Sequence, residues 1–163
     1  MTTDIDKWCS NDVQKINTPG RALYSPLLNE AGGILDDLIV YNLGDHYRII
    51  SNCATCSQNH GWFTKQSDNY DVNIEFMNNF SIIAVQGPNS GNILKSIDMN
   101  GLDEMNDFDV TNVNSMMVAK TGYTGEEGFE IVIDNANVKS LWANLIDAGA
   151  VPIGLGARDT LRL

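Results

Sequence analysis

Two neighbouring carboxylates, Asp36 and Asp37, interrupt the otherwise apolar and β-branched segment 34–43. Because successive side chains of a strand point to opposite faces, one of the two aspartates would face the core. A buried carboxylate without a partner is costly, and buried carboxylates held by hydrogen bonds often do acid–base chemistry. The alternative is an edge strand whose charges prevent aggregation. Spacing favours neither interpretation.

A third carboxylate, Glu130, ends the segment TGYTGEEGFE over residues 121–130, which contains three glycines and three glutamates. The segment lacks the lysine of a phosphate-binding loop and the spacing of a dinucleotide fingerprint, and its glutamates would repel phosphate. A carboxylate can instead accept two parallel N–H bonds from a planar heterocycle. We therefore expect the glycines to let a neutral or amino-bearing ring approach the backbone. The alternative is an exposed strand glutamate.

Arg158 follows in the segment GARD, near a predicted helix start. It could form an ion pair with Glu130 or bind a carboxylate of a ligand. The alternative is a solvated arginine at the surface.

Cysteine and histidine spacing gives only a weak signal for metal or redox chemistry. Cys53 and Cys56 have C-x-x-C spacing, with His46 before them and His60 after them. A zinc site would need all four ligands from this one patch, and a redox pair would need to open a helix in a βαβ unit. Neither context is convincing, so we expect partly buried free thiols and no metal.

Composition describes an ordinary folded chain with a strong negative charge. Of its 163 residues 43% are hydrophobic and 19% charged, and the net charge is −11. This charge disfavours nucleic acid and anionic membrane surfaces as partners. Since no apolar run approaches the length of a membrane span and the N-terminus has no apolar signal region, we expect a soluble, cytoplasmic protein that binds small molecules or proteins.

The elements that must position these side chains follow from periodicity and turn residues. Alternation and β-branched content predict strands over 21–28, 34–43, 46–51, 72–76, 81–86, 115–120 and 128–134. Helical spacing and capping residues predict a short helix within 1–20 and further helices over 53–68, 88–97, 138–148 and from 157 onward. This order predicts an α+β fold with helices on one sheet face.

Four segments, in this order, resemble one known family. They are LYSPLLNEAGGILDDLIVY (23–41), AVQGPN (84–89), KTGYTGEEGFEI (120–131) and PIGLGARDTLRL (152–163). Together they resemble the T-protein of the glycine cleavage system, the tetrahydrofolate-dependent aminomethyltransferase. The resemblance runs from about residue 10 onward, and relative to that family the chain is expected to be truncated at both ends.

The resemblance implies an α+β fold with antiparallel or mixed sheets and helices packed on one face, as in the first two domains of the family. Residues 1–70 would be a partial first domain that carries the GGILDD hairpin. Residues 71–163 would be a ferredoxin-like α+β folate-binding domain that is cut short at its C-terminal end.

The resemblance also implies a reaction. The family takes an aminomethyl group from the lipoyl arm of H-protein, releases ammonia and passes the one-carbon unit to tetrahydrofolate. Asp36 matches the catalytic aspartate, which would stabilise positive charge on the aminomethyl carbon or orient the attacking folate nitrogen. The expected folate-site residues are Tyr24, the backbone around Leu38, Tyr123, Glu130 and Arg158.

Other hypotheses remain beside the enzyme. The chain could be a folate-binding fragment, or a miniature homologue, without catalysis of its own. A folate protein of iron–sulfur assembly would carry a cysteine where residues 120–130 have none. A tRNA-modifying GTPase would add a phosphate-binding loop, and a folate-linked oxidase would add a flavin-binding unit; neither is found.

Overall fold

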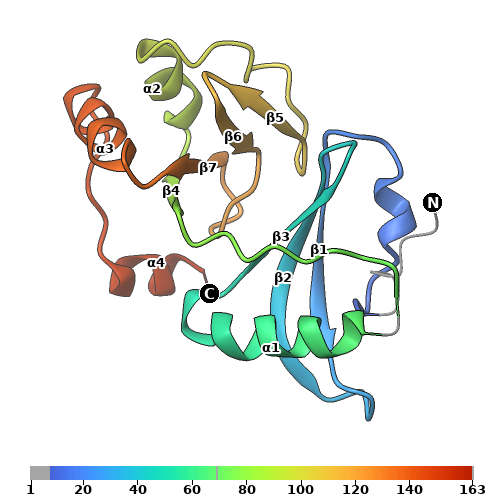
Figure 1. The fold of residues 1–163 in the computed structure, drawn as a ribbon. Helices are drawn as coiled ribbons and strands as arrows, with labels where there is room; N and C mark the ends of the chain where they lie inside the picture. The colour runs from blue at the N-terminus through green and yellow to red at the C-terminus, as the bar shows by residue number, and fades with distance from the viewer. Residues whose placement is uncertain (1–7, 69, 163) are drawn as a thin grey trace. The chain divides into compact units, whose positions relative to one another are not determined.

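A computed structural model describes residues 8–68 and 70–162, and the chain divides into two compact units, Met1–Met77 and Asn78–Leu163 (Figure 1). The division falls after Met77, whereas the sequence prediction placed it after residue 70. Each unit has its own antiparallel sheet and its own apolar core. Among the described residues no helix combines the length and apolar character that crossing a bilayer would require.

The first unit is built on a three-stranded antiparallel sheet in the order β1-β2-β3. Its elements are the 3-10 helix η2 (Val13–Ile16), β1 (Arg21–Leu28), β2 (Ile34–Asn42), β3 (Tyr47–Ser51), the 3-10 helix η3 (Cys53–Thr55) and α1 (Cys56–Ser67). The β1–β2 turn is held by the Asn29 side chain, which accepts hydrogen bonds from the backbone of Ala31 and Gly33. The positive φ of Gly44, +99°, allows the chain to reverse between β2 and β3.

The core of the first unit lies between one face of this sheet and α1 (Figure 1). Leu38 and Val40 of β2 are buried on that face, and Phe63 of α1 packs against them. Trp8 and Trp62 meet edge to face, with ring centroids 6.4 Å apart. Asp36 shares the core face of β2, because strand side chains alternate.

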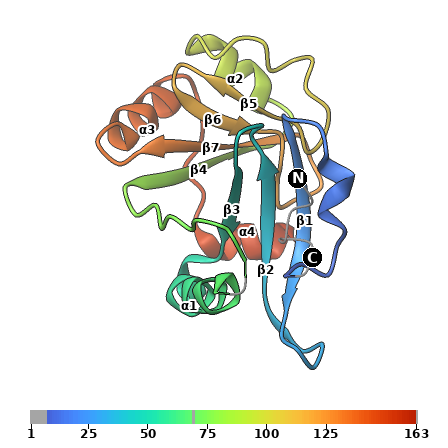
Figure 2. The same cartoon turned by 45° about the vertical axis from the view of Figure 1, so that its right-hand side comes forward.

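The second unit is a four-stranded antiparallel sheet in the order β4-β7-β6-β5 (Figure 2). Its elements are β4 (Phe80–Gln86), α2 (Ser90–Ser96), β5 (Val110–Val113), β6 (Met116–Ala119), β7 (Gly128–Asp134), α3 (Val138–Asp147) and α4 (Leu155–Leu161). The central strand β7 pairs with β4 on one side and β6 on the other. The glycine-rich segment joins β6 to β7.

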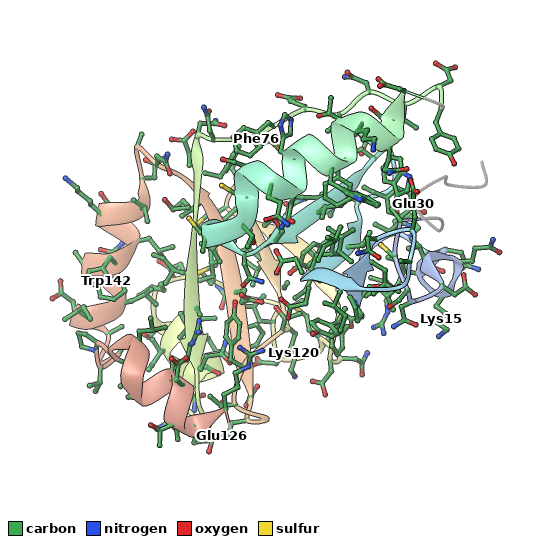
Figure 3. The ribbon with its side chains drawn as sticks, turned by 90° about the horizontal axis from the view of Figure 1, so that it is seen from below. Lys15, Glu30, Phe76, Lys120, Glu126 and Trp142 are labelled. Atoms are coloured by element: carbon green, nitrogen blue, oxygen red, sulfur yellow. The ribbon has the colours of Figure 1, made fainter. Side chains whose placement is uncertain are left out.

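Helices α2 and α3 cover one face of the second sheet. Alternate residues of β7 (Phe129, Ile131 and Ile133) pack with Leu94 of α2 and with Leu141 and Leu145 of α3. On the far side of α3, Trp142 is 49% exposed (Figure 3). These two antiparallel sheets with helices packed on them confirm the predicted α+β fold.

One predicted strand is wrong, one strand was missed, and one helix prediction is tested only in part. Residues 72–76 form no strand, although Ile74 does pack against the first core. Strand β5 was missed because only two of its four residues are apolar and its turn to β6 uses Asn114 and Ser115 at positive φ instead of glycine. The short helix predicted within 1–20 can be compared only over residues 8–20, where the 3-10 helix η2 lies, because the first seven residues are outside the described ones.

The element order of the second unit, β-α-β-β-β-α-α, also differs from the β-α-β-β-α-β order of a ferredoxin-like domain. The glycine-rich segment, rather than a helix, connects its third and fourth strands.

Candidate functional site

Asp36 lies near the start of β2, on the face that α1 covers. It stands opposite Leu27 of β1, next to an irregularity in the pairing between Leu27 and Leu28. The turn of η3 and the first turns of α1 bring polar side chains close to Asp36, near the start of the strand. The carboxylate therefore lies between an apolar core and a cluster of hydrogen-bond donors.

Three side chains donate to the Asp36 carboxylate. The Thr55 hydroxyl donates to Oδ2 at 2.5 Å and the Asn52 amide to Oδ1 at 2.8 Å. The amide of Asn59, a residue only 1% exposed, also donates to Oδ2. Burial alone would raise the pKa of Asp36, but the hydrogen bonds from Thr55, Asn59 and Asn52 outweigh it and hold the pKa below its ordinary value of 3.8. The geometry thus favours a carboxylate that is ionised at neutral pH.

Asp37 connects Asp36 to the predicted ligand residue Tyr24. The Tyr24 hydroxyl donates to Asp37 Oδ2 at 2.9 Å, and the Asn52 amide donates to Asp37 Oδ1 at 2.6 Å. Tyr24 is 45% exposed, so its ring can still contact a ligand. Leu38 is 2% exposed and belongs to the core, which leaves its backbone as the part that could contact a ligand.

Glu130 is held on both carboxylate oxygens by residues of the glycine-rich segment. The Thr121 hydroxyl donates to Oε2 and the Tyr123 hydroxyl donates to Oε1, each at 2.6 Å. Glu130 is 5% exposed, so the hypothesis of an exposed strand glutamate is wrong. Burial raises the pKa of the Tyr123 phenol, and the hydrogen bond and negative charge of Glu130 raise it further. Tyr123 therefore stays protonated and can keep donating.

Arg158 approaches this group from α4. Its guanidinium carbon lies over the Tyr123 ring, 5.3 Å from the centroid, and its Nη2 donates to Asp159 at 3.0 Å. The Arg158 side chain remains 40% exposed. It thus stacks on the tyrosine that holds Glu130 while keeping surface for an anionic group.

Different structural requirements explain the glycines of this segment. Gly125 has a φ of +73°, a value that suits glycine. Gly122 and Gly128 do not have positive φ, but a Cβ at either position would collide with the Gln86 side chain. Two of the three glycines therefore make room for a side chain of the protein itself, and this corrects the expectation that they make room for a ligand.

The structure groups the predicted residues by unit. Tyr24, Asp36 and Leu38 lie in the first unit, and Tyr123, Glu130 and Arg158 in the second. Sequence reasoning missed the donors around both carboxylates. These are Asn52, Thr55 and Asn59 for Asp36, and Thr121 for Glu130. Thr121 could have been found, because it belongs to the segment already singled out.

The first unit also contains an open cavity of about 630 Å³ between β3, α1 and the segment 71–76. Asn59 and Trp8 are among its lining residues, and each has a buried polar atom (Asn59 Oδ1 and Trp8 Nε1) without a hydrogen-bond partner in the described structure.

His46 pairs with Asp45, and His60 packs against Phe76 with ring centroids 4.9 Å apart.

All three cysteines, Cys9, Cys53 and Cys56, are free thiols. Across residues 8–68 and 70–162, no group of three or more histidine, cysteine or acidic side chains is arranged to hold a metal ion.

Comparison with known proteins adds a family match over almost the whole chain. The model of the GCVT N-terminal domain matches residues 2–163. An aminomethyltransferase of Alcanivorax borkumensis is 44% identical over 159 residues, which cover 94% of this chain and 44% of that protein. An aminomethyltransferase of Legionella pneumophila is 43% identical over 164 residues, which cover 98% of this chain and 46% of that protein. The chain thus spans less than half the length of these relatives.

A solved structure shows the same fold. The crystal structure of glycine cleavage system aminomethyltransferase T from Bartonella henselae matches with a TM-score of 0.83 and 29% sequence identity. The match covers 89% of this chain and 40% of that one.

Proposed function

Because the chain belongs to the glycine cleavage T-protein family of aminomethyltransferases, we propose that it takes part in moving a one-carbon unit from aminomethyl-lipoyl H-protein to tetrahydrofolate, with release of ammonia. The first unit would contribute the catalytic aspartate, Asp36, and the second unit would contribute the folate-binding residues Tyr123, Glu130 and Arg158.

The observation that carries this proposal is the hydrogen bonding of Asp36. Asn52, Thr55 and Asn59 all donate to its carboxylate, so its negative charge is stabilised before any substrate arrives. A carboxylate organised in advance can stabilise positive charge that develops on the aminomethyl carbon as ammonia leaves. Its donors also fix its orientation, which positions it for that role.

The residues of the second unit fit a folate. Glu130 already accepts one hydrogen bond on each carboxylate oxygen, and each oxygen keeps a lone pair for N–H groups of a planar ring. Thr124, in the same segment, has a buried hydroxyl without a partner in the described structure, which a ligand could satisfy. When bound, tetrahydrofolate would supply the nucleophilic nitrogen. Arg158 would hold an anionic part of the ligand, and Tyr123 would keep Glu130 oriented.

The first experiment is a calorimetric titration of the 163-residue chain with tetrahydrofolate under reducing, anaerobic conditions. We expect saturable binding that Glu130→Gln weakens. Thermal unfolding should change little, because the hydroxyls of Thr121 and Tyr123 can rotate to suit an amide. The matched control is Glu126→Gln, an exposed residue of the same segment (Figure 3), which should bind like the unmodified chain. Absence of saturable binding would refute the folate part of the proposal.

The second experiment measures ammonia release from aminomethylated H-protein in the presence of tetrahydrofolate. Asp36→Asn should lower turnover by orders of magnitude while folate affinity stays within a few-fold. The exposed Asp45, which pairs with His46, provides the control variant Asp45→Asn. Folate binding without turnover in the unmodified chain would favour the binding module over the enzyme. Equal losses of binding and turnover in Asp36→Asn would assign Asp36 a structural role.

A further inference from the structure

Gln86, the last residue of β4, places its side chain where two glycines leave space. In the β4–β7 ladder Gln86 stands directly opposite Gly128. A Cβ built on Gly128 would overlap the Gln86 amide, and one built on Gly122 would overlap its Oε1. The Gln86 side chain therefore crosses β7 at Gly128 and reaches the first turn of the glycine-rich segment.

The amide makes hydrogen bonds where strand pairing stops. The β6–β7 ladder ends at Ala119 and Glu130, so the segment beyond it no longer has a facing strand. Gln86 Nε2 donates to the backbone carbonyls of Thr121 at 3.2 Å and Phe129 at 3.3 Å. The backbone N–H of Tyr123 approaches Gln86 Oε1 at 3.4 Å. The Gln86 side chain thus supplies, at both ends of the segment, hydrogen bonds that a neighbouring strand would otherwise supply.

These contacts act on the residues that hold Glu130. The carbonyl that Gln86 binds belongs to Thr121, and the N–H that it accepts belongs to Tyr123. The hydroxyls of the same two residues donate to the Glu130 carboxylate. Next to Gln86, the backbone N–H of Gly87 donates to the carbonyl of Glu127 at 2.7 Å. This bond fixes the part of the segment that precedes β7.

We propose that Gln86 is a positioning residue that sets the path of the segment 121–130 and so holds Thr121 and Tyr123 on the Glu130 carboxylate. The proposal rests on the proposed function for its effect on folate, but the placement itself concerns the chain alone. Glutamine suits the task because its amide donates and accepts at once. A leucine of similar size would leave buried carbonyls unpaired, and a glutamate would oppose them with negative charge.

The first test compares tetrahydrofolate affinity in Gln86→Leu and Gln86→Glu with the unmodified chain, at a temperature where all three remain folded. Both variants should bind about tenfold more weakly or worse, since misplaced Tyr123 and Thr121 no longer orient Glu130. Gln66→Leu on α1 makes the same chemical change in the first unit and should bind normally. Normal affinity in both Gln86 variants, with only a lower melting temperature, would overturn the positioning role.

The second test needs no ligand, so it separates this inference from a failure of the proposed function. It is a double-mutant cycle between Gln86→Ala and Gly128→Ala, followed by the fluorescence of Trp142, the only tryptophan in the sequence of the second unit. In the unmodified background Gly128→Ala introduces a collision with Gln86, whereas in Gln86→Ala that space is vacant. The unfolding equilibrium should show a coupling of about tenfold between the two positions. Additive effects would overturn the placement of Gln86.

A nuclear magnetic resonance spectrum of the ligand-free chain completes the test. In protein with labelled tyrosine, the ring signal of Tyr123 is identified by its absence in Tyr123→Phe. Gln86→Leu should shift this signal markedly, because Tyr123 loses its defined contact with Glu130. An unchanged Tyr123 signal would overturn the proposal even if the cycle shows coupling.

Discussion

The hydroxyl of Thr55 allows a direct test of how Asp36 is stabilised. Thr55→Val keeps the shape of the side chain but removes the donor that lies 2.5 Å from Asp36 Oδ2. A hydrogen bond to a charged group contributes about 1.5–3 kcal/mol, and partial exposure of Asp36 places the effect near the lower end. We therefore expect the variant to lose about 1.5 kcal/mol of unfolding free energy at neutral pH, about a tenfold change in the unfolding equilibrium.

The pH dependence of this loss identifies its cause. The pKa of Asp36 in the folded chain lies below 3.8, the value expected after unfolding. Its ionised form therefore contributes stability that is fully present above the unfolded pKa and is lost as pH falls through the folded one. The difference in unfolding free energy between Thr55→Val and the unmodified chain should therefore become smaller as the pH falls. The pKa of Asp36 should rise in the variant.

The assay is denaturant unfolding followed by tryptophan fluorescence in a Trp142→Phe background. Trp8 and Trp62 then report on the first unit alone, because both belong to its aromatic cluster. Thr64→Val is the matched control, since the Thr64 hydroxyl donates only to the backbone of His60 among its described contacts. An equal loss in both variants, or a loss in Thr55→Val that does not change with pH, would refute the role assigned to the Thr55–Asp36 bond.

Three further outcomes follow from the second unit. Ser115→Gly should raise its stability by about 0.5–1 kcal/mol, because Ser115 has a φ of +64°; an unchanged unfolding midpoint would contradict this. Leu94→Ala should cost about 2–5 kcal/mol, since Leu94 is fully buried, and the loss should appear in the Trp142 signal. The phenol of Tyr123 should ionise only above its ordinary pKa of 10, and its pKa should fall in Glu130→Gln, as an absorbance titration against Tyr123→Phe would show.

Elements with a strong apolar period were predictable because at least one face of each is buried; in β7 the opposite face, with Glu130 and Val132, is buried as well. The strand predicted over 128–134 places Phe129, Ile131 and Ile133 in one core, and the helix predicted over 138–148 packs Leu141 and Leu145 in the same core. Alternation failed for residues 72–76, because a strand also needs a partner with free backbone groups. The alternating pattern carries no information about that partner.

The site was only half predictable for a related reason. Asp36 and Glu130 stood out in the sequence because each is a charged residue among the apolar residues of a predicted strand. Their donors carry no such local signal. Asn52 and Thr55 come 16 and 19 residues after Asp36, and only the fold of η3 onto β2 brings them to it. The link from Gln86 to Thr121 spans 35 residues and is visible only once β4 lies beside β7.

The space that the Gln86 side chain occupies makes the residues tolerated at positions 86, 122 and 128 depend on one another. Because the Gln86 amide is the flexible end of its side chain, a larger residue at either glycine would displace that amide from its hydrogen bonds, and this displacement costs nothing where residue 86 is already shorter. Shortening residue 86 first, by contrast, leaves both glycines free to drift. Substitutions among the three sites should therefore accumulate in a preferred order. A sequence signature that scores the glycines alone omits Gln86, the residue on an earlier strand whose side chain lies against them.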